Sequence, residues 1–466
     1  GIIIRISYFR KIKGVKCMSF SAKMMNLGMR KVYDYLEKDP KTNLPKLMEM
    51  IDKVLPESVY APQRKVFREI LENQDNNWFE LIESVWTDID PQIIRKFFEN
   101  FIMNANLDWA EKREKVMEEY HCNVPWAILL DPTSACNMHC TGCWAAEYGH
   151  KLNLSLETID DIVTQGKKLG TYMYIYTGGE PMVRKKDIIT ICERHPDCEF
   201  LSFTNGTLID EEFCQEMLRV KNFVPAISLE GFETANDGRR GPGVFDKVKH
   251  AMQLLKEHNL PFGISTCYTS MNYKDITSEE FYDMIIEAGA LFIWFFHYMP
   301  VGNDAAPELM PNPEQRKAVY ERIRAFRSSK PIFSLDFQND AEYIGGCIAG
   351  GRYYLHINAA GDVDPCVFIH YSNANIHEVS LLDALKSPIF QAYRKGQPFN
   401  DNMLRPCPML ENPECLPKMV KETGAHSTDP QSPEDVQHLC DKCKPYAEAW
   451  TKMADKLWVE RQTAKK

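Results

Sequence analysis

From Val124 onward, short apolar segments alternate with amphipathic ones, and this alternation limits the possible folds more than any other feature of the sequence. Short apolar runs rich in β-branched and aromatic residues are typical of buried strands, and apolar residues at three- and four-residue spacing are typical of helices. Such alternation predicts an α/β fold with a parallel sheet or partial barrel, whose site lies at the carboxyl ends of the strands. The expected strand segments are WAILLDPT, YMYIYTGG, EFLSFTNG, FVPAISLEG, FGISTCYTS and FIWFFHYMPVG.

The segments on either side have a different pattern. Residues from about 28 to 120 carry only helical periodicity, with prolines near the expected helix starts. From about residue 331 the pattern becomes irregular, and it ends in a helical segment, YAEAWTKMADKLW. We therefore expect a helical N-terminal region (1–125), a central α/β barrel (126–330) and a small, irregular α+β C-terminal domain (331–466).

Composition and charge argue against two classes of function. The net charge of −10 over 466 residues argues against a broad nucleic-acid-binding surface. No run of eighteen apolar residues exists, so we expect no membrane span. The opening GIIIRISYFRKIKGVKC is either a misplaced start, with Met18 or Met24 as the true beginning, or a basic interfacial segment that contacts anionic lipid.

Fifteen cysteines without a secretory signal indicate a reducing, cytoplasmic location, where clustered thiols indicate metal binding more often than disulfides. Three lie within residues 136–143, and six lie in the last third of the chain. Core packing is the expectation for the scattered ones, which are Cys17, Cys122, Cys192, Cys198, Cys214 and Cys267.

Cys136, Cys140 and Cys143 follow the first expected strand. A cubane [4Fe–4S] cluster normally takes four thiolates, so three thiolates leave one iron open for an exogenous ligand. A zinc site completed by His139 or His150 is the alternative. With its C-x3-C-x2-C spacing, the motif strongly resembles that of the radical S-adenosylmethionine (SAM) superfamily.

The resemblance implies a partial (β/α)6 TIM-like barrel of the radical SAM type and a [4Fe–4S] cluster that binds SAM. In that family the amino and carboxylate groups of SAM chelate the open iron. One electron, which flavodoxin or ferredoxin would supply, then cleaves SAM to methionine and a 5′-deoxyadenosyl radical that abstracts a substrate hydrogen atom. The three cysteines are accordingly the catalytic and metal-binding residues that we expect.

Three further strand ends carry matching motifs. YTGGEP resembles the family's Gly-Gly-Glu-Pro motif, whose glycines let the backbone approach a ligand and whose glutamate receives the methionyl ammonium group. SFTNG resembles the Thr-Asn-Gly turn, and ISLEG with RRGPGVF resembles a pattern of peptide-modifying members, whose serine binds the SAM ribose and whose arginine pairs with the SAM carboxylate. The resemblance thus assigns SAM binding to Gly178, Gly179, Glu180, Asn205, Ser228 and Arg240.

Two positions depart from the family pattern. Gly142 stands where an aromatic residue commonly packs near adenine, and we expect Trp144 to cover that gap. In having a glycine at this position, the motif resembles that of the hopanoid-adenosylating branch of the family, whose substrate is a hydrocarbon. Glu230 replaces the usual aspartate, and its role as a site residue or an ordinary loop carboxylate stays open.

The spacing C-x13-G-x4-C from Cys347 to Cys366 resembles the start of a SPASM or twitch domain, a module that carries an auxiliary iron–sulfur cluster. Six C-terminal cysteines cannot fill two all-cysteine clusters of four, so we expect one auxiliary [4Fe–4S] cluster. Its expected ligands are Cys347, Cys366, Cys407 and Cys415, and Cys440 with Cys443 are the alternative pair.

The function that we predict is radical SAM hydrogen-atom abstraction, with a peptide or protein as substrate. A lipid or isoprenoid substrate is the alternative within the same chemistry, and a non-enzymatic iron–sulfur electron carrier is the alternative from another class. Cys267 on an expected strand could donate a hydrogen atom to a product radical, and His297 and Tyr298 could bind SAM or substrate, although core packing explains all three residues more simply.

Overall fold

The computed structural model describes residues 22–54 and 61–464. The expected N-terminal interfacial segment, Met18 and Cys17 lie outside these ranges. Among the described helices, none is both long and apolar enough to cross a bilayer.

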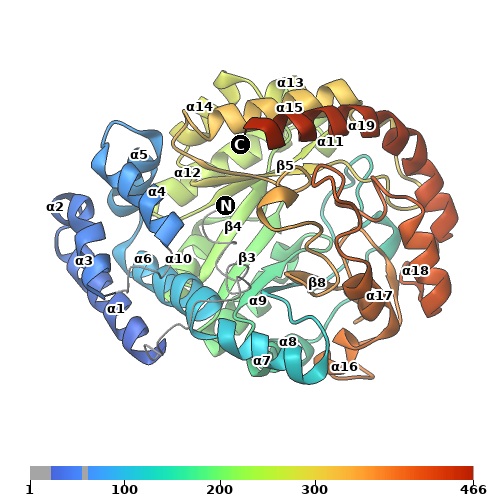
Figure 1. Ribbon diagram of the computed structural model, residues 1–466, viewed down its shortest axis with the longest axis horizontal. Coiled ribbons are helices and arrows are strands. Elements are labelled where there is room, and N and C mark those ends of the chain that lie inside the picture. The colour runs from blue at the N-terminus through green and yellow to red at the C-terminus, as the bar shows by residue number, and fades with distance from the viewer. Residues whose placement is uncertain (1–21, 55–60, 465–466) are drawn as a thin grey trace.

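The centre of the molecule is a curved, nine-stranded sheet (Figure 1). Its strand order is β7-β6-β5-β4-β3-β2-β1-β8-β9, and neighbouring strands from β7 to β8 run parallel. This order confirms the partial α/β barrel. The strands are β1 (Ala127–Leu130), β2 (Met173–Tyr176), β3 (Glu199–Thr204), β4 (Phe223–Ser228), β5 (Gly263–Tyr268), β6 (Phe292–His297), β7 (Phe333–Asp336), β8 (Tyr354–Ile357) and β9 (Val363–Asp364).

Helices follow the strands and cover the outer face of the sheet, where they bury isoleucine, leucine and phenylalanine side chains. Many begin at a side-chain cap, as at Ser155, Asp210 and Ser278, whose oxygens accept backbone N–H groups of the first turn. The helices of the barrel layer are α8 (Leu156–Leu169), α9 (Lys185–Arg194), α10 (Glu211–Val220), α11 (Glu233–Arg240), α12 (Val244–Glu257), α13 (Tyr273–Ile276), α14 (Glu279–Glu287) and α15 (Pro313–Phe326).

The sheet extends beyond the six strands that the sequence indicates. β7 and β8 both lie after residue 330, and β8 pairs in parallel with β1, Ala127 opposite Tyr354. The expected boundary at residue 330 therefore does not coincide with an edge of the sheet. The C-terminal region also contains β10 (Tyr371–Ser372), β11 (His426–Ser427), α16 (Leu381–Leu385), α17 (Pro388–Gly396), α18 (Cys415–Thr423) and α19 (Val436–Ala464).

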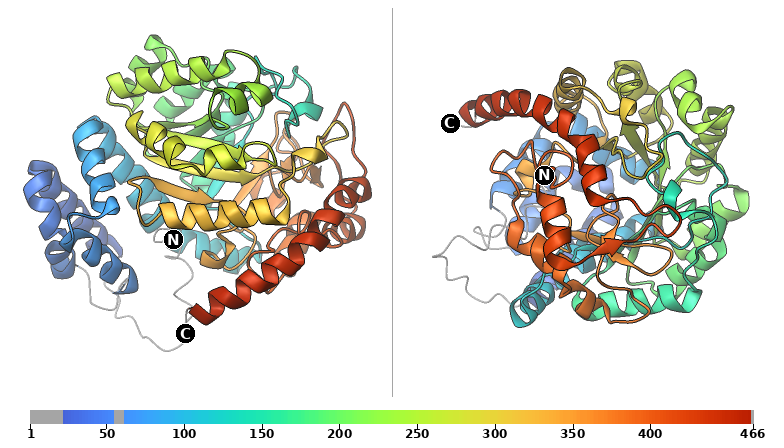
Figure 2. Two further views of the ribbon diagram at one scale, coloured as in Figure 1. Left: turned by 90° about the horizontal axis from the view of Figure 1, so that it is seen from above. Right: turned by 90° about the vertical axis from the view of Figure 1, so that its right-hand side faces the viewer.

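The described part of the N-terminal region is helical, as predicted, and it has two parts. The first helices form a small separate core that includes Val32, Leu47 and Phe79, and Figure 2 shows them as a lobe at one side of the barrel. The later ones pack against the barrel itself through residues such as Ile93 and Ala105. The helices are α1 (Ala22–Lys38), α2 (Pro40–Asn43), α3 (Leu47–Val54), α4 (Ala61–Glu72), α5 (Asn77–Asp88), α6 (Pro91–Phe97), the π-helix η4 (Phe98–Asp108) and α7 (Ala110–Tyr120).

Candidate functional site

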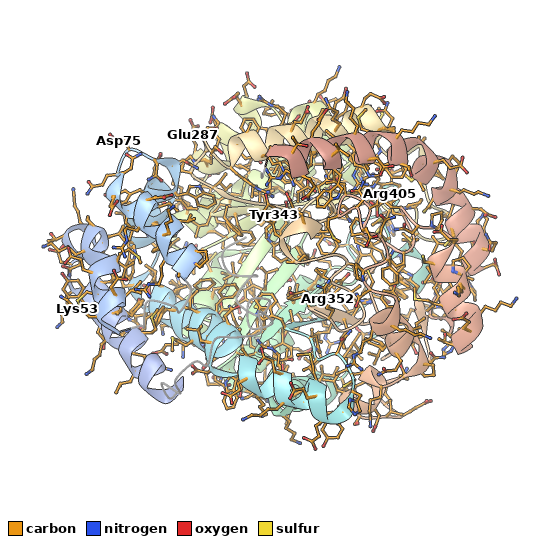
Figure 3. All side chains as sticks on the ribbon, viewed as in Figure 1. Lys53, Asp75, Glu287, Tyr343, Arg352 and Arg405 are labelled. Carbon is orange, nitrogen blue, oxygen red and sulfur yellow. The ribbon has the colours of Figure 1, made fainter. Side chains whose placement is uncertain are left out.

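A cavity of about 1480 Å³ runs through the interior of the barrel. It is larger than the roughly 300–1,000 Å³ of most small-molecule sites, so it has room for more than one ligand. One end is lined by Cys136, Cys140 and Cys143, and the other end reaches residues at the amino ends of the strands. Tyr343 and Arg352, labelled in Figure 3, line the same cavity from the C-terminal region.

The loop that carries the three cysteines is held by the Gly178–Gly179 turn after β2. The N–H of Gly179 donates to the Thr133 carbonyl at 3.1 Å, and the N–H of Glu180 donates to the Ala135 carbonyl at 2.8 Å. A Cβ on Gly179 would lie 2.2 Å from the Ala135 oxygen, and Gly178 has φ +107°. The two glycines are therefore required for backbone packing against the cysteine loop, a role that the sequence did not indicate.

Glu180 is 1% exposed and connects the ends of β2 and β3. Its Oε1 accepts from the N–H of Met182 and the hydroxyl of Thr204 at 2.9 and 2.6 Å, and its Oε2 accepts from the N–H of Asn205 at 2.7 Å. Burial raises its pKa, and these hydrogen bonds oppose the rise. A carboxylate offers about four acceptor positions, so the predicted bond to a SAM ammonium group has one position left.

Asn205 connects the third strand end to the cysteine loop. Its amide Nδ2 donates to Asn137 Oδ1 at 2.8 Å, and its Oδ1 accepts from the N–H and hydroxyl of Thr207. Asn137 lies between the first two cysteines of the motif. Asn205 lines the cavity, and it supports the cysteine loop directly.

The fourth strand end carries a buried charge cluster. Glu230 Oε1 accepts from Arg239 Nη1 at 2.6 Å and from Arg240 Nε and Nη2 at 3.0 and 2.5 Å. The Glu230 side chain is 0% exposed, which explains why it has two cationic partners. Arg239, Arg240 and Ser228 all line the cavity beside the thiols. For Arg240 to meet the SAM carboxylate, as we predict, it must share its guanidinium with Glu230.

Tyr298, not Trp144, fills the space beside Gly142. A Cβ on Gly142 would lie 2.4 Å from Tyr298 Oη, and Gly142 has φ +64°. Trp144 instead packs against the rings of His356, Phe368 and others of the C-terminal region, with centroid distances of 5.8 and 6.3 Å. The expectation for Trp144 was wrong because the left-handed backbone at Gly142 admits an aromatic ring from the end of β6.

Two of the three thiols, those of Cys136 and Cys140, lie in surroundings that favour the protonated form. Burial raises the pKa of Cys136 to about 11 and also raises the pKa of Cys140, where the charge of Arg240 opposes the rise. Iron would therefore displace protons on binding. Within the described ranges, no three His, Cys, Asp or Glu side chains converge closely enough to hold a single ion. A cubane suits the thiols better, because each thiolate binds a separate iron.

A second group of thiols lies in the C-terminal region. Cys347 acts electrostatically on both Cys366 and Cys407, which places these three thiols near one another. Cys407 Sγ accepts from the N–H groups of Met409 and Leu410 at 3.4 Å, and Tyr354 Oη lies 2.7 Å from Cys366 Sγ. Such N–H and O–H donors stabilise thiolates, as the environment of an iron–sulfur cluster requires.

The fourth expected auxiliary ligand has a different position. Cys415 begins α18 and acts electrostatically on Cys440 in α19, whose neighbour Cys443 is buried. Burial raises the pKa of Tyr393, and Cys366, Cys407 and Cys440 add to the rise, so Tyr393 is close to members of both groups. The choice between Cys415 and the Cys440–Cys443 pair therefore stays a prediction.

Other candidates also lie at the cavity. Cys267 lines it close to Cys143 and Arg239, and burial raises its pKa to about 12. His297 is buried, with a pKa well below its ordinary value, and its Nδ1 donates to the Tyr298 carbonyl at 2.6 Å. The sequence analysis did not single out Arg239, although it precedes Arg240 in the same motif.

Two family models match the chain. One describes the radical SAM superfamily and covers residues 130–288. The other describes an iron–sulfur cluster-binding domain, SPASM, and covers residues 347–411. The matched ranges contain the two thiol groups at Cys136–Cys143 and Cys347–Cys407.

Similar proteins agree with these matches. An AdoMet-dependent heme synthase of Methanosarcina barkeri is 25% identical over 289 residues, which are 55% of this chain and 80% of that protein. A PqqA peptide cyclase of Granulibacter bethesdensis is 24% identical over 307 residues, 61% of this chain and 79% of that protein. Among solved structures, Streptococcus suis SuiB bound to S-adenosylmethionine shares the fold, with a TM-score of 0.55, 19% identity and coverage of 71% of this chain and 81% of that chain.

The cofactors follow from the two matched domains. The radical SAM domain binds SAM and a [4Fe–4S] cluster, and the SPASM domain binds an auxiliary iron–sulfur cluster. The thiol groups, the glycine turns beside the first group and the donors around the second fit these cofactors. The chain is therefore an enzyme of the radical SAM superfamily with a SPASM domain.

Proposed function

We propose that the protein abstracts a hydrogen atom from a largely apolar substrate that occupies the barrel interior. When bound at the thiol end, the cluster and SAM supply the reductive cleavage that yields methionine and a 5′-deoxyadenosyl radical. The cavity carries this proposal, because the three thiols and the residues assigned to SAM line one end of it. The remaining volume continues away from them along the inside of the barrel.

Different residues at the thiol end of the cavity would bind the cluster and SAM. Cys136, Cys140 and Cys143 would hold the cluster, and the Gly178–Gly179 turn would keep their loop in place. Ser228 and the Arg239–Arg240 pair would orient SAM through its ribose and carboxylate. The aromatic side chains that line the barrel interior would limit the access of water and so protect a radical from side reactions.

The inward-facing strand positions favour an apolar substrate. Parallel pairing places Leu129, Ile175 and Leu201 side by side, and Trp294 pairs with Leu335 farther along the barrel. These positions line the cavity together with Phe203, Phe292, Phe296, Phe333 and Phe337. A lipid- or isoprenoid-like molecule would bury its surface against them.

A peptide or protein substrate is the second candidate. It is supported by relatives that are named peptide cyclases and by the S. suis SuiB structure that contains its precursor peptide SuiA. For either substrate, a reducing compartment with flavodoxin or ferredoxin as electron donor would suit the chemistry.

Anaerobic reconstitution followed by dithionite and SAM tests the proposal. We expect 5′-deoxyadenosine, measured by chromatography, and an increase in its rate of formation with a solvent-extracted lipid fraction of cells. An increase with the peptide fraction alone would select the second candidate. No 5′-deoxyadenosine under any of these conditions would contradict both.

The auxiliary cluster has a separate test. Replacing Cys136, Cys140 and Cys143 together by alanine should leave about four irons per chain, the content of one cubane. Because four thiolates leave no open iron, the electron paramagnetic resonance signal should not change when SAM is added. An iron-free variant would contradict a cluster at Cys347, Cys366 and Cys407.

A further inference from the structure

At the end of the barrel interior farthest from the thiols, the sheet wall carries a buried carboxyl group beside apolar side chains. Glu199 is the first residue of β3, and it shares the inward side of that strand with Leu201 and Phe203. Its neighbours in the same row of the sheet are Met173 and Ala127. Strands that rise about 3.3 Å per residue place Glu199 on the order of 15–20 Å from the thiol end.

No donor among the described residues meets hydrogen-bond geometry with the Glu199 carboxylate, although the Asn100 amide lies close enough to lower its pKa. Glu199 is 2% exposed, and both of its carboxylate oxygens are buried without a donor. The neighbouring Asn100 amide does not satisfy it, because its Nδ2 donates to the carbonyls of Pro196 and Cys198 at 3.2 and 2.8 Å. A buried carboxyl group without a donor costs free energy, so its retention at a cavity wall indicates that a ligand supplies the donor.

The cationic side chains near this end donate to backbone carbonyls and not to the carboxylate, and the charge of Lys96 lowers the pKa of Glu199 without a hydrogen bond. Arg113 lines the cavity, but its guanidinium donates to the carbonyls of Gly170 and Ala105. Phe101 and Trp126 line the cavity nearby with ring centroids 5.7 Å apart, and aromatic faces attract cations. A buried carboxylate in a cavity that is also lined by aromatic rings is a suitable environment for an ammonium group.

We propose that this end of the barrel interior binds the amino group of an elongated, largely apolar substrate through Glu199. The inference rests on the proposed function, because it assigns the same cavity to the same substrate. The opposite end of such a molecule would reach the region beside Cys143 and Cys267, where the hydrogen atom would be removed. Glu199 would therefore fix the depth and direction of the substrate.

The protonation state of Glu199 supports its assignment as the ammonium-binding group, and proton release on binding can be measured. Burial raises the pKa of Glu199 to about 8, while the charge of Lys96 on α6 and the Asn100 amide on η4 oppose the rise. Burial raises the pKa of the Cys192 thiol on α9 and of the Cys198 thiol, and the charge of Glu199 adds to the rise at both. At pH 7 the free carboxyl group is therefore protonated, and an incoming ammonium group should displace that proton.

Isothermal titration calorimetry of the reconstituted holoenzyme tests the proposal with three probes of equal length, namely dodecylamine, dodecan-1-ol and dodecanoate, below their micellar concentrations. We expect the amine to bind at least tenfold more tightly than the other two and to release up to one proton at pH 7. The proton appears as a dependence of the measured enthalpy on the ionisation enthalpy of the buffer.

Glu199→Gln should reduce the preference for the amine to less than threefold and abolish proton release. The matched control is Glu193→Gln, an exposed glutamate on α9 that pairs with Arg219 and should keep both properties. Equal affinities of the three probes, a preference for the alcohol or acid, or an unchanged Glu199→Gln variant would overturn the proposal. If the variant fails to fold, the relative affinities of the three probes and the proton release, both measured on the unmodified enzyme, still test the proposal.

The two proposals can fail separately. Amine binding without 5′-deoxyadenosine formation would leave the Glu199 subsite intact and contradict the proposed function. Formation of 5′-deoxyadenosine without a preference for the amine would contradict the subsite alone.

Discussion

At the carboxyl ends of the strands the cavity is lined by loops, thiols and a buried charge cluster, whereas at the amino ends its sheet wall consists of apolar side chains and the Glu199 carboxyl group. The polar groups at the first end satisfy one another, as Glu180 does with Thr204 and Asn205. Glu199 at the other end has no such partner among the described residues. The difference indicates that the first end is organised before its ligands bind, and that the second end is completed by its ligand.

The largest expected effect is at the thiol end. Cys140→Ala should abolish 5′-deoxyadenosine formation, because a cubane without one of its three thiolates is incomplete and labile. Chromatography of the products checks this, and Cys214→Ala, at a cysteine buried on α10, is the matched control that should keep the activity. Undiminished 5′-deoxyadenosine from Cys140→Ala would contradict the assignment of the site.

A second change tests whether the thiol end is organised by backbone packing. Gly179→Ala should destabilise the protein by about 1–3 kcal/mol, because the new Cβ would lie 2.2 Å from the Ala135 carbonyl oxygen. Urea unfolding measures the change in the free energy of unfolding. Gly238→Ala in α11 is the control, since no atom lies within 4 Å of its added Cβ, and it should not destabilise the protein. Equal effects of the two variants would show that the turn is not constrained.

A substitution in the buried charge cluster should have a smaller effect, which is limited to the affinity for SAM. Arg240→Ala should raise the dissociation constant of SAM at least tenfold, since a charged hydrogen bond contributes about 1.5–3 kcal/mol, while iron content stays constant. Equilibrium dialysis and an iron assay measure the two quantities. Arg219→Ala, at an exposed ion pair with Glu216, is the control. An unchanged dissociation constant for Arg240→Ala would mean that this guanidinium serves only Glu230.

The last effect, which appears only as a pH dependence, concerns the opposite end in the absence of ligand. The folded pKa of Glu199, about 8, is above its ordinary value of 4.5, so the folded state retains a proton that the unfolded state loses. The stability contributed by that proton is present below pH 4.5 and is lost as the pH rises through 8. Between pH 6 and 8.5 the wild type should lose about 2 kcal/mol more than Glu199→Gln in urea unfolding. Parallel pH profiles would show that a donor satisfies Glu199.

The sequence was sufficient for the barrel and for the thiol groups. Strand segments, helix periodicity and the C-x3-C-x2-C spacing are local signals, and the six expected strands formed where their patterns predicted. The position of the motifs at successive strand ends also follows from chain order, because parallel strands bring their carboxyl ends together. The spacing from Cys347 to Cys366 likewise predicted a SPASM domain, which the family match confirms.

Only the tertiary structure determined the contacts between segments far apart in the chain. The pairing of β8 with β1 and the packing of Tyr298 beside Gly142 depend on where the chain returns, and no local pattern encodes this. The same holds for Glu199, which in the sequence is one of many glutamates at the start of an apolar strand. Its chemistry arises because the barrel closes around it and excludes water, and burial without a partner is a property of the assembled fold.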